Sequence, residues 1–159
     1  MKVFAIILIV LLLAAVAGLG YLYFSATMEI EVTGCIATDA ATQADTFQEL
    51  KTAAEEETLT GTLFRKPGEA TPEACVFYTY TVKVTNKTFL KAEVIEISVT
   101  PMDGDILQMG DMQAHDLDSG RTAELSATIL SLKESHSVRE GTVTYYLWGI
   151  PFSRRVTLK

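Results

Sequence analysis

Residues 75–86 read CVFYTYTVKVTN, and this stretch decides the fold class. Apolar and aromatic side chains occupy every second position from Val76 to Val84, and mainly polar side chains fill the positions between them. A period of two residues is that of a β-strand with one buried face. The pattern therefore predicts a long strand whose apolar face needs a second layer of structure against it.

The same alternation recurs on both sides of this stretch, interrupted by turn residues. It predicts further strands at 28–36, 58–65, 90–101, around 106–107, and at 122–130, 142–150 and 152–159. The Asn-Lys-Thr turn at 86–88 suggests that strands 75–86 and 90–101 form a hairpin. The same tripeptide is a glycosylation sequon in a eukaryotic secretory route and an ordinary turn otherwise.

Turns rather than crossover helices join most of the predicted strands, which favours antiparallel pairing. Seven or eight such strands would form two sheets that bury their apolar faces against each other. Without the one non-strand excursion, about 100 residues remain, which is the size of an immunoglobulin domain. The sequence thus predicts a mainly β protein, an antiparallel immunoglobulin-like β-sandwich with one short surface helix.

That helix is predicted within an excursion at about 39–57. The segment is rich in helix-forming residues, and Thr42 and Asp45 have the spacing of a capping box. We expect the helix to run from about Thr42 to Glu56. Its apolar stripe is thin, and glutamates crowd the end where the helix dipole disfavours anions. A position on the surface of the domain follows.

The chain begins with a segment of a different kind. Residues 3–24 are 22 consecutive residues without a charged or strongly polar side chain. A helix of this length would be about 33 Å long, enough to cross a hydrocarbon core of about 30 Å. The alternative is a cleaved secretion signal with a small-residue site at 15–17. Because the apolar run continues past that site, we favour an anchor at 1–27 and a β-sandwich domain at 28–159.

Charge predicts the orientation of this anchor and excludes two classes of partner. Lys2 precedes the apolar run, and the first basic residue after it is Lys51, so the N-terminus should be cytoplasmic and the domain extracytoplasmic. Without Lys2, 12 basic and 20 acidic side chains remain. This acidic balance argues against nucleic acid and anionic lipid headgroups as partners.

Two cysteines fall in the predicted exported domain, where a disulfide is chemically permitted. In strict alternation Cys35 points away from the face that holds Val32, and Cys75 shares the corresponding outward face with Phe77. A disulfide between Cys35 and Cys75 is therefore possible if their strands are neighbours. The alternative is two unrelated reduced thiols.

Residues 76–130 resemble a known group of domains. A strand that ends in Val-x-Asn at 84–86 leads to a predicted hairpin, and a Leu-x-x-Gly turn at 117–120 precedes the next strand. This arrangement is similar to the small extracytoplasmic immunoglobulin-like or fibronectin-type domains of bacterial envelope proteins, including the group called FxLYD. The resemblance implies a binding or spacer module with no catalytic residues to carry over.

Few residues are candidates for chemistry. His115 and His136 lie far apart in polar loops, without the short spacings of zinc ligands. Ser135 beside His136 lacks the glycine-flanked elbow of a serine hydrolase. The acidic loops 103–118 suggest calcium binding. Their spacing is not that of an EF-hand, however, and Asp-Gly turns also explain these residues. We expect no enzyme activity, no cofactor and no metal site.

The last predicted hairpin carries large side chains on both faces. Val143, Tyr145 and Leu147 share one face, and Tyr146 and Trp148 share the other. One set belongs to the core. The other is either a recognition patch or the second half of a wrapped core, and we favour the core.

These observations lead to an expected function. We expect a single-pass protein of the cell membrane whose extracytoplasmic β-sandwich serves as a protein-interaction or spacer module of the cell envelope, with a protein as its partner. The alternative is a small-ligand or calcium-binding envelope protein that uses the acidic loops 103–118.

Overall fold

The computed structural model describes residues 2–25, 27–110, 115–135 and 137–159. Strand β3 (Cys75–Asn86) coincides with the stretch that predicts the fold. It lies inside a five-stranded sheet between β1 (Met28–Asp39) and β7 (Thr122–Leu132), antiparallel to both. Beyond β7 follow β5 (Asp105–Gly110) and the two-residue strand β2 (Thr62–Leu63).

The second sheet has four strands in the order β6-β4-β8-β9. Their bounds are His115–Leu117 for β6, Ala92–Val99 for β4, Arg139–Leu147 for β8 and Ile150–Leu158 for β9. The predicted hairpin between 75–86 and 90–101 is therefore wrong, because β3 and β4 lie in different sheets. Alternation reports which face of a strand is buried, but it does not report which strand is its neighbour.

The strand order is that of an immunoglobulin-type sandwich. In that fold the first, second, fifth and fourth strands form one sheet, and the third, sixth and seventh form the other. Apart from the edge strands β2 and β6, the orders β1-β3-β7-β5 and β4-β8-β9 reproduce this arrangement. The predicted fold class is confirmed: two antiparallel sheets, one short helix, and an apolar helix at the N-terminus.

The main core lies between the two sheets. The predicted inward face of β3 is buried there, together with Leu125, Ala127 and Ile129 of β7 and Val143, Tyr145 and Leu147 of β8. Tyr145 stacks on Phe152 of β9 with ring centroids 5.7 Å apart. The contacts fit the usual preference of aromatic pairs for ring separations of about 4.5–7 Å.

A second, smaller core lies on the outer face of the five-stranded sheet. Helix α2 (Ala44–Glu55) covers this face and buries Phe47 and Ala54 against Phe77, Ile106, Leu107 and Leu130. The short surface helix thus shields apolar residues that the sandwich alone would expose to water.

The start of this helical excursion differs from the prediction. A 3₁₀ helix, η1 (Ala40–Gln43), precedes α2 and is capped by Asp39, which accepts from the backbone N of Ala41 at 3.1 Å. The predicted capping box at Thr42 and Asp45 is not formed, since the Thr42 hydroxyl donates to the backbone O of Asp39. A second 3₁₀ helix, η2 (Pro72–Ala74), leads into β3.

Helix α1 (Lys2–Ser25) contains one stretch, Val3–Tyr21, that is long and apolar enough to cross a membrane. None of that stretch is buried inside the structure. A signal sequence has the same properties. The predicted apolar N-terminal helix is confirmed.

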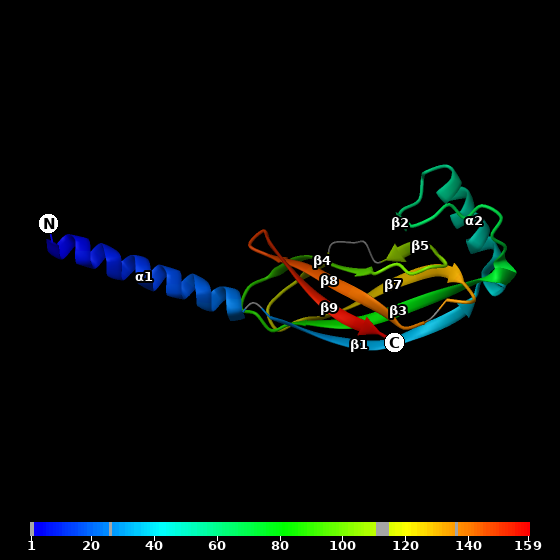
Figure 1. Ribbon diagram of the computed structural model, residues 1–159. Coiled ribbons are helices and arrows are strands. Elements are labelled where there is room, and N and C mark those ends of the chain that lie inside the picture. The colour runs from blue at the N-terminus through cyan, green and yellow to red at the C-terminus, as the bar shows by residue number, and fades with distance from the viewer. Residues whose placement is uncertain (1, 26, 111–114, 136) are drawn as a thin grey trace.

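Two ends of the sandwich are distinguished from here on. The proximal end, next to α1, holds the start of β1 and the loops 87–91, 118–121 and 148–149. The distal end holds α2, the loop 100–104 and residues 133–135 after β7. Figure 1 shows α1 projecting from the proximal end and α2 lying at the opposite end.

Candidate functional site

A buried ion pair lies at the distal end, where the two sheets come together. Asp105 begins β5 in one sheet, and Arg139 begins β8 in the other. Arg139 Nη2 donates to Asp105 Oδ1 at 3.0 Å, and both side chains are 0% exposed. Asp105 Oδ2 also accepts from the backbone N of Met102 at 2.7 Å. The pair therefore joins the two sheets through charge-assisted hydrogen bonds.

The guanidinium of Arg139 has further contacts that fix its plane. Its Nη1 lies 3.0 Å from the sulfur of Met102, and its Cζ lies 5.8 Å from the centre of the Tyr78 ring. A cation within about 6 Å of an aromatic face is attracted by the ring quadrupole. Arg139 thus acts as a structural clamp whose charge is matched inside the protein.

Tyrosines from β3 hold the loop beside this clamp. The Tyr78 hydroxyl donates to the backbone O of Ser135 at 3.1 Å, and the Tyr80 hydroxyl donates to that of Ser137 at 2.6 Å. The pKa of Tyr80 is raised far above its usual range, mainly by burial and secondly by the nearby Cys35 thiol. The hydroxyl therefore stays protonated and remains a donor at all physiological pH values.

A pocket of about 910 Å³ opens above the clamp. Its walls are residues 63–65, 101–105, 134 and 135. Gly104, with φ of 96°, leaves no space for a side chain, because a Cβ there would lie 2.5 Å from Ser135 Oγ. The pocket therefore has a tightly packed floor in which Asp105 is already engaged by Arg139.

Ser135 and Asp103 lie side by side in the wall of this pocket. Ser135 is the serine considered above for a hydrolase and not favoured. The Ser135 hydroxyl contacts Ser131 Oγ at 2.6 Å and the backbone O of Asp103 at 3.3 Å. Neither partner is a base of the kind that activates a nucleophilic serine. His136 lies outside the described residues, so its relation to Ser135 is not part of this geometry.

The described carboxylates of the acidic loops 103–118 are divided between the two ends of the domain, and Asp111 lies outside the described residues. Asp103 and Asp105 lie at the distal end, whereas Asp116 and Asp118 lie at the proximal end, where Asp116 pairs with Lys91. Within residues 2–25, 27–110, 115–135 and 137–159, no group of three or more His, Cys, Asp or Glu side chains could hold a metal ion. The geometry thus gives the calcium alternative no preformed site in this part of the chain.

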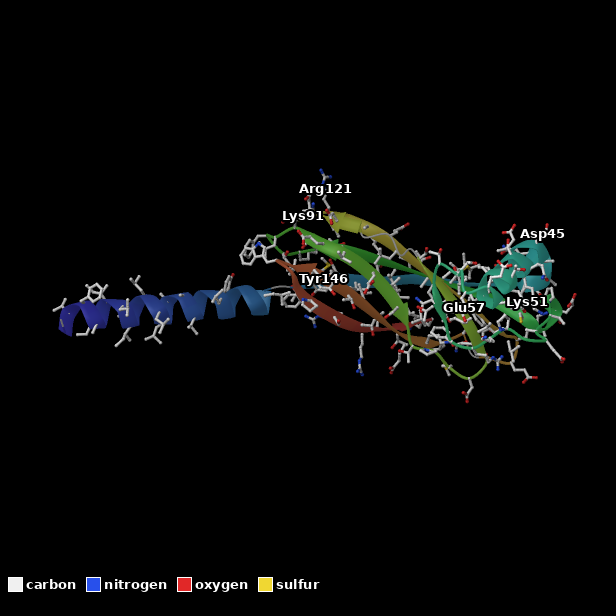
Figure 2. All side chains as sticks on the ribbon, turned by 90° about the horizontal axis from the view of Figure 1, so that it is seen from above. Asp45, Lys51, Glu57, Lys91, Arg121 and Tyr146 are labelled. Carbon is white, nitrogen blue, oxygen red and sulfur yellow. The ribbon has the colours of Figure 1, made fainter. Side chains whose placement is uncertain are left out.

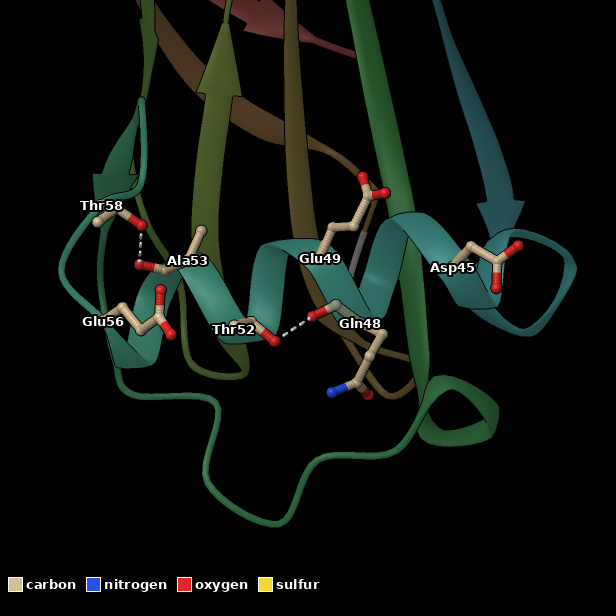
Figure 3. Close-up of a pocket in the computed structure, with 7 residues that line it drawn as sticks. All are labelled: Asp45, Gln48, Glu49, Thr52, Ala53, Glu56 and Thr58. Carbon is tan, nitrogen blue, oxygen red and sulfur yellow. Dashed lines mark hydrogen bonds between the residues drawn. The ribbon is translucent and has the colours of Figure 1, made fainter.

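An open groove of about 630 Å³ runs along the outer side of α2 (Figure 3). The lining side chains are mostly polar, and three of them are the carboxylates of Asp45, Glu49 and Glu56. The other lining residues are Gln48, Thr52, Ala53 and Thr58. Small-molecule sites are usually enclosed and lined with apolar groups. This exposed acidic surface is better suited to contact with another macromolecule.

The two cysteines are free thiols, and the possible disulfide is not formed. Thr33 and Gly34 form a β-bulge in β1, which reverses the alternation and turns Cys35 toward the main core. Cys75 lies in the second core, on the other face of β3. Because Cys35 sits opposite Tyr80, about 17 Å along β3 from Cys75, the sulfurs are too far apart to bond. Burial raises the pKa of both thiols.

The aromatic residues of the last hairpin do not all enter the core. Val143, Tyr145 and Leu147 are buried as predicted, and Tyr146 is half-buried. Trp148 is 64% exposed, so the favoured interpretation of a wrapped core is wrong for this residue. The hairpin loop turns at Trp148 and Gly149, beyond the last paired residue of β8.

The comparisons with known proteins name no family for this chain. No protein family model matches it, and neither does any curated protein. Among solved structures, it is similar to the crystal structure of a FixG-related protein from Vibrio parahaemolyticus, with a TM-score of 0.39 and 16% sequence identity. That alignment covers 84% of this chain and 94% of the other. The resemblance to FxLYD-type domains stays a prediction.

Proposed function

We propose that the protein is a single-pass membrane protein of the cell envelope whose β-sandwich is an extracytoplasmic protein-interaction module. One observation carries the proposal: a helix with a 19-residue apolar stretch, none of it buried, is joined to a sandwich with its own complete core. Such a helix is stable in hydrocarbon rather than in water. The sandwich needs no contribution from it.

The orientation in the proposal follows from charge. Lys2 lies before the apolar stretch, and Glu29 and Glu31 follow it at the start of β1. The positive-inside bias then keeps the N-terminus cytoplasmic and exports the sandwich.

The distal end is the part of the module that meets partners in this proposal. With β3 about 40 Å long, the groove on α2 stands well away from the end that is tethered. Its carboxylates are exposed and face away from the sheet (Figure 3). Surface charge of one sign selects a partner of the opposite sign and speeds its association. The expected partner is a protein with a basic patch.

Site-specific photo-crosslinking in cells tests this function. A photoreactive residue at Gln48, exposed on α2, should form a covalent adduct of discrete mass, whereas one at Ser153, exposed on the flank of β9, should not. Paired replacement Glu49→Lys and Glu56→Lys should reduce the adduct, and Glu96→Lys on β4 is the matched control that should not. Adducts at neither position would identify a spacer instead, and adducts only at Ser153 would place the partner on another surface.

A further inference from the structure

The proximal end lies close to the helix that the proposal places in the bilayer. Helix α1 ends at Ser25 and β1 begins at Met28, so only two residues separate them. At no more than about 3.6 Å per residue, this link keeps the start of β1 within about 11 Å of the helix end. The register Met28↔Asn86 and Thr85↔Thr122 brings the loops 87–91 and 118–121 to the same level.

This end of the sandwich exposes the large aromatic side chains. Outside α1, the exposed aromatic residues among those described are Phe89, at 59%, and Trp148, at 64%. Ile150, at 51%, follows Trp148 in the same hairpin. Phe89 precedes β4, which pairs antiparallel with β8 through Glu93↔Tyr146. Two positions beyond that pair, Lys91 lies level with Trp148. The two loops therefore lie side by side.

The backbone at Trp148 is unusual for so large a residue. Trp148 has φ of 53° and Gly149 has φ of 73°, the pair of left-handed conformations found in a two-residue hairpin loop. Asn-Gly is the sequence that such a loop favours, and a bulky side chain there is strained. A bulky residue at a strained position points to a role for its side chain outside the fold.

Polar residues surround the apolar ones, and Lys87 and Lys91 among them form ion pairs. Lys87 pairs with Glu29 at 3.1 Å, and Lys91 pairs with Asp116. Figure 2 shows Lys91, Arg121 and Tyr146 gathered at the end next to α1, with Asp45, Lys51 and Glu57 at the other end. Aromatic rings with a polar rim are typical of surfaces that lie at the membrane interface.

We propose that the proximal end of the sandwich rests on the lipid bilayer, with Phe89, Trp148 and Ile150 inserted at the boundary between headgroups and acyl chains. The inference rests on the proposed membrane anchoring by α1. Because Lys87 and Lys91 already pair with carboxylates, the contact depends on apolar insertion and not on anionic lipid. Two attachments, the helix and this surface, then hold the groove on α2 at a defined height and direction.

Trp148 is the chain's only tryptophan, so its fluorescence reports this contact directly. The full chain is reconstituted into phosphatidylcholine vesicles, with and without lipids brominated high on their acyl chains. Trp148 emission should be blue-shifted, shielded from iodide, and reduced by roughly half or more by the brominated lipids, as expected for a ring at the interface. Addition of salt should change none of these results.

A double variant, Trp148→Gly with Gln48→Trp, moves the tryptophan to α2 and is the matched control. Glycine suits the left-handed loop position, so the hairpin should be retained. In vesicles its emission should be quenched by iodide and not by brominated lipid.

The outcomes separate the two proposals. A chain that floats with the vesicles while Trp148 is quenched by iodide and not by brominated lipid would overturn the bilayer contact and leave the anchor standing. Shielding from iodide without quenching by brominated lipid would also overturn it, in favour of a protein covering this surface. A chain that does not float with the vesicles would overturn both proposals.

Discussion

Replacement of Asp105 by Asn should destabilise the domain by about 3–5 kcal/mol, the usual cost of removing one member of a buried ion pair. The side chain of Arg139 is 0% exposed and would lose its charged partner without gaining water. Chemical unfolding of the full chain in a mild detergent, followed by far-ultraviolet circular dichroism, measures the change. Arg139→Met should give a loss of similar size.

Two controls separate burial from charge pairing as such. Lys133 Nζ donates to Asp39 Oδ2 at 2.8 Å, but these side chains are 43% and 45% exposed. Lys133→Met should therefore change the stability little, since exposed pairs contribute little. The double variant Asp105→Leu with Arg139→Met replaces the buried pair by apolar side chains and should recover much of the loss. If a single variant at Asp105 is as stable as the wild type, the buried Asp105–Arg139 ion pair does not stabilise the domain.

Replacement of Asn86 by Asp should also cost about 3–5 kcal/mol, because it removes the two hydrogen bonds that Asn86 Nδ2 donates to backbone carbonyls and buries a charge. Asn86 is 0% exposed. Its Nδ2 donates to the backbone O of Leu90 at 2.7 Å and of Leu117 at 2.8 Å. Its Oδ1 accepts from the backbone N of Thr88 at 2.9 Å and from its hydroxyl at 2.8 Å. Asp has the same shape as Asn but cannot donate when ionised.

The pH dependence gives this prediction a sign. Burial without a cation raises the pKa of the introduced carboxyl in the folded state above its value in the unfolded chain. Protonation then favours the folded state, so the deficit relative to wild type should shrink as the pH falls through that raised pKa. Asn86→Ala, which buries no charge, should lose less stability and show no such recovery. Equal losses for Asp and Ala at every pH would contradict this account.

The same contacts assign the Asn-Lys-Thr tripeptide to structure. All the hydrogen-bonding groups of the Asn86 side chain are engaged inside the protein. Of the two interpretations of the sequon, the folded chain therefore uses it as a turn, and the amide is out of reach of a glycosyltransferase.

Local patterns in the sequence predict where a strand lies and which of its faces is buried. The bounds of β3 and the buried faces of β3, β7 and β8 follow from the alternation, because it reports burial directly. The parity of Cys35 could not be predicted, since one extra residue at Thr33 and Gly34 reverses every side chain after it. The hairpin error has a related cause: strand partners are set by contacts distant in sequence.

The candidate sites were harder to predict for the same reason. Asp105 is visible in the sequence only as one of several turn carboxylates, and its partner Arg139 lies 34 positions later. No periodicity links two such residues. The aromatic proximal end could be recognised only in part, because exposure of Trp148 depends on where the hairpin turns.

The central claim is that α1 stays in a membrane and holds the sandwich on its outer side. Protease treatment of spheroplasts that express the full chain with an epitope after Lys159 tests it most directly. We expect the epitope to be lost from intact spheroplasts, while an α1 fragment stays in the membrane fraction after alkaline carbonate extraction. An epitope that survives until the membrane is permeabilised, or a soluble chain that lacks its first residues, would contradict the account.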